Sequence, residues 1–187
     1  MQRADFKVVI DACVLANFRV CDVLLTLAES PRLFLPRWSQ QILDETRRTQ
    51  INKLGWSESV ADSFRAEVNA HFPEARVHGF EHLIDKCSNE EKDRHVLACA
   101  IHNKAELILT FNLKDFPESS LNKWQIEVKH PEEYLLALYS IEPVSVVHRL
   151  ETIARDRQEE LEDYLLGLGR WLPAFVQRII GDLQITS

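Results

Sequence analysis

The sequence predicts an α/β fold with a mostly parallel sheet covered by helices on both faces, followed by a helical C-terminal extension. Two observations carry this prediction. Short apolar runs alternate with helical patterns up to residue 130, which is typical of parallel sheets. From Pro131 onwards, apolar residues recur only at helical spacing. We therefore expect one domain over residues 1–130 and an extension over residues 131–187.

The strands are predicted from short apolar runs. The first, residues 7–10, is rich in β-branched residues and is followed at once by Asp11. The second, residues 33–36, ends at Pro36, and the run LILT at residues 107–110 has the apolar character of a buried strand. Weaker strands are predicted at residues 75–77 and 125–128.

Helices are predicted where apolar residues recur every three or four positions. The first follows Asp11, and the others span residues 39–51, 57–71 and 93–102, with Ser57 as a candidate N-cap. In the extension we expect helices over residues 132–140, 144–155, 158–167 and 171–183. Their apolar faces most often pack on the protein's own core, and alternatively bind a second copy or a partner protein.

Length and composition indicate one globular domain of ordinary size with a small appendage. No apolar run approaches the roughly 18 residues of a membrane helix, and the start lacks the apolar segment of a signal peptide. The four cysteines have no paired metal-ligand spacing. We therefore expect a cytoplasmic protein with reduced thiols.

The net charge of −7 is unevenly distributed along the chain. Residues 1–130 carry 19 acidic and 17 basic side chains, whereas residues 131–187 carry 10 and 5. A nearly balanced domain can bind nucleic acid through a local basic patch. Five cations around the second strand and helix are candidate phosphate contacts, or simply a solvated face: Arg32, Arg37, Arg47, Arg48 and Lys53.

Two aspartates follow predicted strands and are expected at the same edge of the sheet. Asp11 comes directly after the first strand, and Asp115 lies in the loop that leaves the strand ending at Thr110. Functional groups collect at the carboxyl edge of parallel sheets. Each aspartate also has a structural interpretation, because Asp11 could cap a helix and Asp115 could belong to a turn.

Two further acids lie on predicted helices. At 100° per residue, Glu45 shares a helix side with Trp38 and Ile42, whereas Asp44 points the other way. Asp93 opens its helix at the end of the buried face, and there it could also act as a cap. A carboxylate on a core-facing side needs a cation, a metal or hydrogen-bond donors as partner.

The four acids Asp11, Glu45, Asp93 and Asp115 together have the chemistry of a divalent metal site. Mg²⁺ takes oxygen ligands and is often held by only a few carboxylates and water. One or two such ions can activate a water molecule and stabilise charge on a phosphate during hydrolysis. Spacing does not separate this hypothesis from the structural interpretation of each acid, because the four acids are far apart in the chain.

Four segments together resemble the PIN-domain ribonuclease family. They are VVIDACVLAN, SQQILDETRR, KDRHVLACAI and LILTFNLKDFP, within a resemblance that covers roughly residues 5 to 130. It implies a three-layer α/β/α sandwich and an endoribonuclease that depends on Mg²⁺ or Mn²⁺. It also implies that the four acids are the catalytic metal ligands, with Thr110 and Asn112 lining the same site. The family often has an aspartate nearer to position 112, so Asn112 is a departure that leaves open whether it or Asp115 fills the fourth position.

The segments LFLPRWSQQILDE and GFEHLI, with the helical ending, resemble a subgroup of VapC-type toxins that carry a helical C-terminal extension. This resemblance implies the toxin of a type II toxin–antitoxin pair, with RNA as substrate and a small antitoxin that covers the active site as its usual partner. A homodimer is an alternative way to cover the apolar faces of the helical ending. Two alternatives to the toxin remain open. One is a housekeeping RNA-processing or DNA nuclease, and the other is a catalytically silent binding module whose acids are structural.

Overall fold

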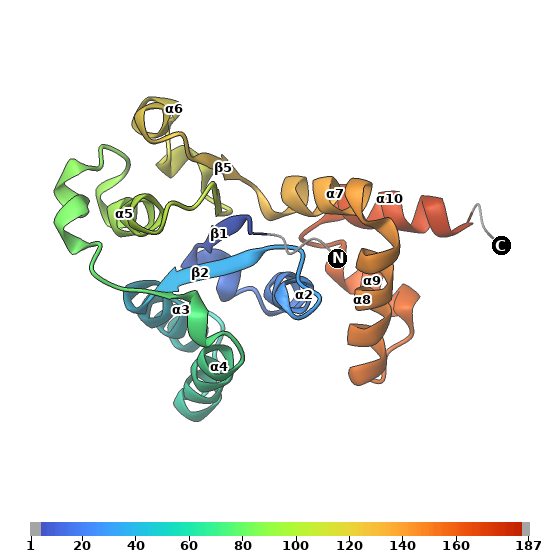
Figure 1. The fold of residues 1–187 in the computed structure, drawn as a ribbon. Coiled ribbons are helices and arrows are strands. Elements are labelled where there is room, and N and C mark those ends of the chain that lie inside the picture. Colours follow the sequence, from blue (N-terminus) through green and yellow to red (C-terminus); the bar gives the residue numbers. More distant parts are fainter. Residues whose placement is uncertain (1–4, 185–187) are drawn as a thin grey trace.

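The computed structural model describes residues 5–184 and shows an α/β/α sandwich around a five-stranded parallel sheet (Figure 1). The strands are β1 (Lys7–Ile10), β2 (Leu35–Ser39), β3 (Arg76–Val77), β4 (Leu107–Leu109) and β5 (Glu127–Lys129). They lie in the order β3-β2-β1-β4-β5, and every neighbouring pair is parallel. The predicted α/β class and parallel sheet are therefore confirmed.

The helices of the first 130 residues cover both faces of the sheet. They are α1 (Ala12–Leu15), α2 (Phe18–Ala28), α3 (Gln40–Asn52), α4 (Glu58–His71), α5 (Arg94–Asn103) and α6 (Glu118–Leu121). Helices α2 and α3 contact β2, with α4 packed on α3, whereas α5 contacts β1, β2 and β4 from the other face (Figure 1). The sheet is thus buried between two helical layers, as its apolar strands require.

The direction in which strands are added reverses between β1 and β4. The chain adds β2 and β3 on one side of β1 and then returns to add β4 and β5 on the other. Right-handed connections that run in opposite directions place their helices on opposite faces, which leaves a crevice at the carboxyl ends of the two central strands. Asp11 follows β1 and Thr110 follows β4, so both residues border this crevice.

Strand β2 begins two residues later than predicted and contains Pro36 instead of ending at it. The Leu35 N–H donates to the Phe6 carbonyl at 2.8 Å, so the backbone nitrogen of the next residue, Pro36, points away from β1. On that side β3 pairs only with Trp38 and Ser39. Pro36 therefore lies where β2 is still an edge strand and where a missing N–H leaves no partner unsatisfied.

Serine caps set the start of the two helices that follow β2. The Ser39 hydroxyl accepts the Ile42 N–H at 3.2 Å, and the Ser57 hydroxyl accepts the Val60 N–H at 3.3 Å. Each cap satisfies a backbone donor that the first helical turn leaves free. The helices predicted at residues 39–51 and 57–71 are thus found as α3 and α4, and the Ser39 cap fixes the rotational phase at which Glu45 emerges.

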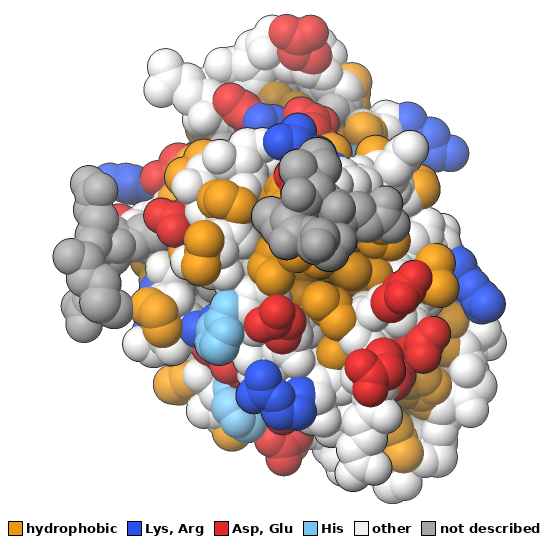
Figure 2. Space-filling view, turned by 90° about the vertical axis from the view of Figure 1, so that its right-hand side faces the viewer, with side chains coloured by type: hydrophobic (Ala, Val, Ile, Leu, Met, Phe, Trp, Pro, Cys, Tyr) orange, Lys and Arg blue, Asp and Glu red, His pale blue; other side chains and the backbone are white. Residues whose placement is uncertain are grey.

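The chain continues into four helices, α7 (Pro131–Ile141), α8 (Pro143–Asp156), α9 (Leu161–Leu168) and α10 (Pro173–Gln184), close to the four predicted. Helix α8 packs along α2, and the Arg157 guanidinium binds the Asp22 carboxylate at 2.7 Å. Figure 2 shows this side of the molecule, where hydrophobic side chains gather near the centre with charged side chains around them. Within residues 5–184 no helix has the length and apolar character of a membrane span.

The apolar residues predicted to need a cover are mostly covered by the chain itself. Leu150, Leu165, Phe175 and Ile179 are buried in a core that is continuous with that of the sheet. Trp171 differs, because it keeps 53% of its surface exposed.

Leu150→Ala should lower the free energy of unfolding by about 2–5 kcal/mol, because it leaves a cavity where α8 packs on α2. Val144→Ala on the same helix is the matched control, since Val144 is 82% exposed and its loss should change stability by less than about 0.5 kcal/mol. Urea unfolding of both variants measures the difference. Equal effects of the two changes would contradict the packing described for the extension.

Candidate functional site

Asp11 is buried, and its carboxylate accepts hydrogen bonds from the start of α1 and from the residue that follows β4. Oδ1 accepts the Ala12 N–H at 2.6 Å, so the residue does cap α1. Oδ2 accepts the hydroxyl of Thr110 at 2.7 Å, across from the end of β4. Asp11 is thus both a cap and a carboxylate fixed in the crevice between β1 and β4.

Cys13 completes the contacts between the two strand ends. Its thiol lies 3.2 Å from Asp11 Oδ2 and 3.4 Å from the Thr110 hydroxyl, and its sulfur accepts the Phe111 N–H. Burial, followed by the negative charge of Asp11, raises the pKa of Cys13 to about 12. Cys13 is therefore a neutral thiol that packs and donates, and it lacks the reactivity of a thiolate nucleophile.

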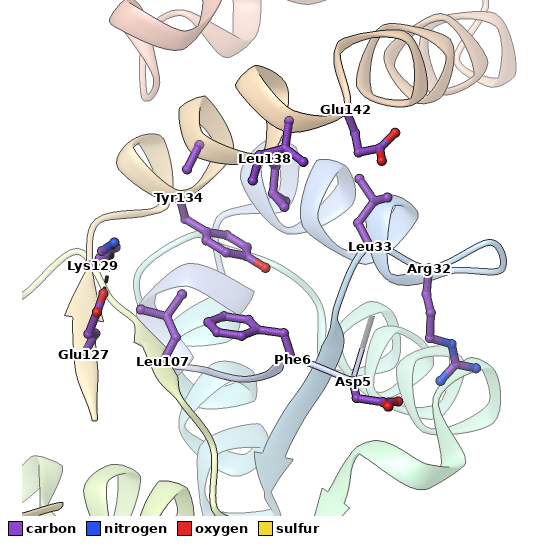
Figure 3. A pocket seen from close by; sticks show the side chains of 12 residues that line it. Asp5, Phe6, Arg32, Leu33, Leu107, Glu127, Lys129, Tyr134, Leu138 and Glu142 are labelled. Atoms are coloured by element: carbon purple, nitrogen blue, oxygen red, sulfur yellow. Dashed lines mark ion pairs between the residues drawn. The ribbon is translucent and has the colours of Figure 1, made fainter. Parts of the chain in front are cut away.

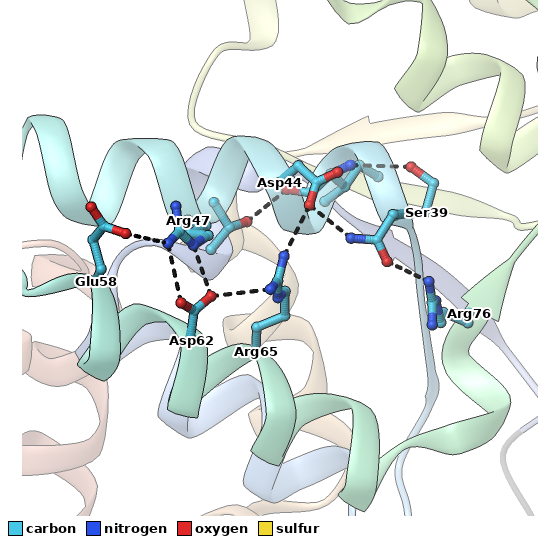
Figure 4. A network of polar contacts seen from close by, with 10 residues as sticks. Ser39, Asp44, Arg47, Glu58, Asp62, Arg65 and Arg76 are labelled. Carbon is cyan, nitrogen blue, oxygen red and sulfur yellow. Dashed lines mark hydrogen bonds and ion pairs between the residues drawn. The ribbon is translucent and has the colours of Figure 1, made fainter.

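Helical phase separates Glu45 from its neighbour Asp44. The Asp44 carboxylate binds Arg65 of α4 at 3.3 Å and accepts the amide of Gln40, at the start of α3, at 2.7 Å (Figure 4). Glu45 lies on the side of α3 that faces the crevice, with its Oε1 3.1 Å from His95 Nε2 and 3.6 Å from the Arg48 guanidinium. The structure thus directs one acid of this pair to the site and the other to a surface ion-pair network.

His95 is a site residue that the sequence pattern did not identify. Its ring is 3% exposed and lies at hydrogen-bond distance from Glu45, although the two groups are not aligned for a hydrogen bond. By helical angle His95 points away from Asp93, which hides its link to the acids. The available signal was that a buried imidazole on one helix and a core-facing carboxylate on another each require a polar partner.

Asp93 is an acid of the site whose ionised form the folded protein disfavours. It is 8% exposed, and its Oδ2 has no hydrogen-bond partner. Burial first, and then the negative charge of Asp11, raise the pKa of Asp93 from 3.8 to about 6. The Oδ2 oxygen is therefore without a hydrogen bond, and the Lys92 ammonium, 3.4 Å away, is its cationic partner.

Lys92 lies between Asp93 and Asp115. Its ammonium donates to Asp115 Oδ2 at 2.8 Å and lies 3.4 Å from Asp93 Oδ2. The hydrogen bond from Lys92 lowers the pKa of Asp115, so this acid stays ionised as the partner of a cation. Asp115 ends the short 3₁₀ turn Leu113–Asp115, where its N–H donates to the Asn112 carbonyl.

A cleft of about 340 Å³ opens at this edge of the sheet. Three of the four predicted acids line the cleft. Asn112 also lines it, whereas Asp115 does not. The lining side chains that can bind metal or phosphate are Asp11, Cys13, Glu45, Arg48, Thr49, Asn52, Lys53, Lys92, Asp93 and Asn112. Thr110 lies beneath the cleft and orients Asp11. The structure therefore brings the predicted site residues to one place, with Asp115 behind Lys92.

Only two of the five predicted phosphate-binding cations, Arg48 and Lys53, line the cleft. Arg47 binds Asp62 and Glu58 on the opposite side of α3 (Figure 4), and Arg32 binds Glu74. Arg37 is buried against the Asn103 side chain. The phosphate-binding interpretation is thus limited to the two cations at the cleft, because the other three are occupied elsewhere.

The side chains of the cleft fit a hard divalent cation in type, since they offer carboxylate and amide oxygens, among them a buried Asp93 oxygen that accepts no hydrogen bond. Among residues 5–184, however, no three His, Cys, Asp or Glu side chains are grouped closely enough to hold a metal ion as they stand. A cation could bind there only if side chains such as Lys92 and Glu45 moved.

A larger cavity, of about 570 Å³, lies at the opposite edge of the sheet (Figure 3). Phe6 and Leu107 at the amino ends of β1 and β4 line it together with Tyr134 and Leu138 of α7. The charged groups at its rim include the Glu127–Lys129 ion pair at 3.0 Å. None of the four predicted acids reaches this cavity, so size alone does not locate the site.

Comparison with known proteins gives one match of moderate extent. The chain is 39% identical over 92 residues to the protein named "Putative ribonuclease VapC50" from Mycobacterium tuberculosis. The match covers 48% of this chain and 52% of that protein, so the chain spans about half the length of the relative. No family model matches the sequence, and no solved structure matches it.

Asp93→Asn should stabilise the metal-free protein at pH 7.5 by up to about 3 kcal/mol, because folding raises the pKa of the Asp93 carboxyl from 3.8 to about 6. The folded state disfavours ionised Asp93, so the gain should be present above pH 6 and disappear as pH falls below 4. Urea unfolding in a chelator at pH 7.5 and pH 4 measures it.

Asp115→Asn is the matched control, because that carboxylate is stabilised by Lys92 and its loss should destabilise the protein at pH 7.5. An Asp93→Asn variant less stable than the parent at pH 7.5 would show that burial and the charge of Asp11 do not disfavour ionised Asp93 as described.

Proposed function

We propose that this chain is a metal-dependent endoribonuclease that hydrolyses RNA phosphodiester bonds, with Asp11, Glu45, Asp93 and Asp115 as its catalytic acids. The observation that carries the proposal is the pairing of two buried carboxylates, Asp11 and Asp93, at the reversal point of a parallel sheet. Burial first, and then the negative charge of Asp11, raise the pKa of Asp93, and carboxyl groups perturbed in this way gather at functional sites. The similarity to a protein named as a ribonuclease points the same way.

Mg²⁺ or Mn²⁺ bound by these acids would supply an activated water molecule and neutralise charge on the phosphate. The chain's own residues have three tasks. Thr110 holds the Asp11 carboxylate in one orientation, and His95 lies against Glu45. Arg48 and Lys53 at the cleft can bind the phosphates that flank the cleaved bond.

The fourth acid position has two candidates on this proposal. Asn112 lines the cleft, whereas Asp115 contacts Lys92 at its edge. Lys92 now contacts both Asp93 and Asp115, so either Asn112 or Asp115 would join Asp93 in holding a divalent cation, which would supply the positive charge that Lys92 supplies in its absence.

We further propose that the chain is the toxin of a type II toxin–antitoxin pair. The support is the name of the relative, VapC50, and the chain's resemblance to VapC-type toxins. A cytoplasmic RNA substrate, a small antitoxin that covers the cleft, and association into a homodimer belong to this proposal. So does a PIN-like nuclease unit over residues 1–130, with residues 131–187 as its extension.

A catalytically silent binding module is the second candidate. It is favoured by Lys92, which neutralises two of the acids, by Asn112, which replaces a carboxylate, and by the lack of a preassembled metal group in residues 5–184. In that case the wild type would bind RNA or a partner but cleave nothing at any concentration of divalent metal.

Asp11→Asn and Glu45→Gln should each lower metal-dependent RNA cleavage by at least about 100-fold, because even partners outside a metal's direct ligands are worth about 10- to 100-fold. Asp44→Asn is the matched control, since Asp44 is next to Glu45 in the chain but faces Arg65. Cleavage of a labelled RNA with Mg²⁺ or Mn²⁺ gives the rates.

Sequencing of RNA ends after induction of the wild type beside Asp11→Asn identifies the substrate in cells. New ends that depend on Asp11 are expected. Full activity in Asp11→Asn, or an equal loss in Asp44→Asn, would count against the proposed acids, and no cleavage by the wild type would favour the silent module.

A further inference from the structure

An aromatic cluster continues the carboxyl edge of the sheet beyond the acids. Phe111 follows Thr110 after β4, and His130 follows β5, so both emerge at the same edge as Asp11. Their ring centroids are 5.1 Å apart. Trp171, from the turn between α9 and α10, lies over Phe111 with a centroid separation of 6.2 Å and an interplanar angle of 40°.

The Trp171 turn is anchored on both sides. Leu172 and Phe175 are fully buried, and the Trp171 N–H donates to the Leu168 carbonyl at 3.0 Å. The Glu132 carboxylate accepts the Ala174 N–H at 2.6 Å and so ties the start of α10 to α7.

The same tie leads to His130. The Glu132 N–H donates to His130 Nδ1 at 3.2 Å, so one residue links the imidazole to the turn that carries Trp171. One network thus holds the His130 ring and the backbone of the turn that carries Trp171, so little backbone freedom is left to lose when a ligand binds.

This rigid position leaves a large apolar surface uncovered. Trp171 is 53% exposed, although Leu168 and Leu172 of the same turn are buried. Arg170 is exposed beside it and forms no ion pair among residues 5–184. An indole, a phenyl ring and an unpaired guanidinium are the groups on which nucleic-acid bases and phosphates bind.

The cluster is also continuous with the cleft. Asn112, which lines the cleft, is the next residue after Phe111, and the Phe111 N–H donates to the sulfur of Cys13. A strand whose phosphate lies at the acids could therefore place a neighbouring base on the aromatic cluster.

We propose that Phe111, His130 and Trp171 form a stacking platform for one base of single-stranded RNA, and that the helical extension supplies its exposed face. This inference deepens the proposed nuclease function and rests on it for the identity of the strand. A nucleic acid is favoured over a protein partner because the platform connects through Asn112 to a cleft lined by acids, Arg48 and Lys53, the set expected around a phosphodiester.

The test is binding of a fluorescent single-stranded eight-nucleotide RNA in the presence of Mg²⁺, with Asp11→Asn in every protein to prevent cleavage. Trp171→Ala should weaken binding roughly 5- to 150-fold, the range found for loss of one stacked base. Trp171→Phe should retain binding within about threefold of the parent.

Leu166→Ala is the matched control, because Leu166 is an apolar residue of the same extension with a similar exposure of 60%. It should bind as the parent does. Tryptophan fluorescence gives a second readout, since RNA should quench the parent and the quenching should be much reduced in Trp171→Phe. This readout does not require the alanine variant to be stable.

Unchanged binding in Trp171→Ala together with unchanged quenching in Trp171→Phe would overturn the platform, and so would a loss confined to binding of a protein partner. The outcome is separable from the nuclease proposal. If the wild type cleaves RNA and Trp171 has no effect, the platform alone fails. If the wild type cleaves nothing and RNA binding still depends on Trp171, the platform stands and the nuclease proposal fails.

Discussion

The hydrogen bond from the Thr110 hydroxyl to the Asp11 carboxylate joins the two strands between which the sheet reverses its order. Parallel strands β1 and β4 are neighbours there, but the chain segments that follow them diverge to opposite faces, so polar groups at their ends meet in a crevice. Everything else at the site is arranged around this bond. Helix α3 brings Glu45, α5 brings Asp93, and the loop after β4 brings Asn112.

Concentrating acids in a crevice costs stability, and the molecule offsets that cost locally. Asp93 retains the penalty as a raised pKa and an oxygen without a hydrogen bond, whereas the hydrogen bond from Lys92 lowers the pKa of Asp115. Lys92 reaches both acids from a largely exposed position, so it can leave without disrupting the core. On the proposed function, a divalent cation would take over the charge neutralisation that Lys92 provides in this structure.

The fold class could be predicted from the sequence because each strand and helix has a local pattern that agrees with its place in the structure. Short apolar runs that alternate with helical patterns predicted the parallel sheet. Helical phase correctly separated Glu45 from Asp44, since an amphipathic helix has one buried side. Strand order, the contact of His95 with Glu45 and the Lys92 bridge could not be predicted, because they join segments far apart in the chain. The position of Pro36 was mispredicted for a similar reason, since only the short length of β3 makes that part of β2 an edge.

The proposed function requires above all that a divalent cation binds between Asp11 and Asp93. Crystals of the protein grown with Mn²⁺ and measured for anomalous scattering locate such an ion without reference to activity. We predict a peak in the cleft, in contact with Asp11 and Asp93 and with the Lys92 ammonium displaced. A cleft that holds no anomalous peak at saturating Mn²⁺, with Lys92 still bound to both acids, would contradict it.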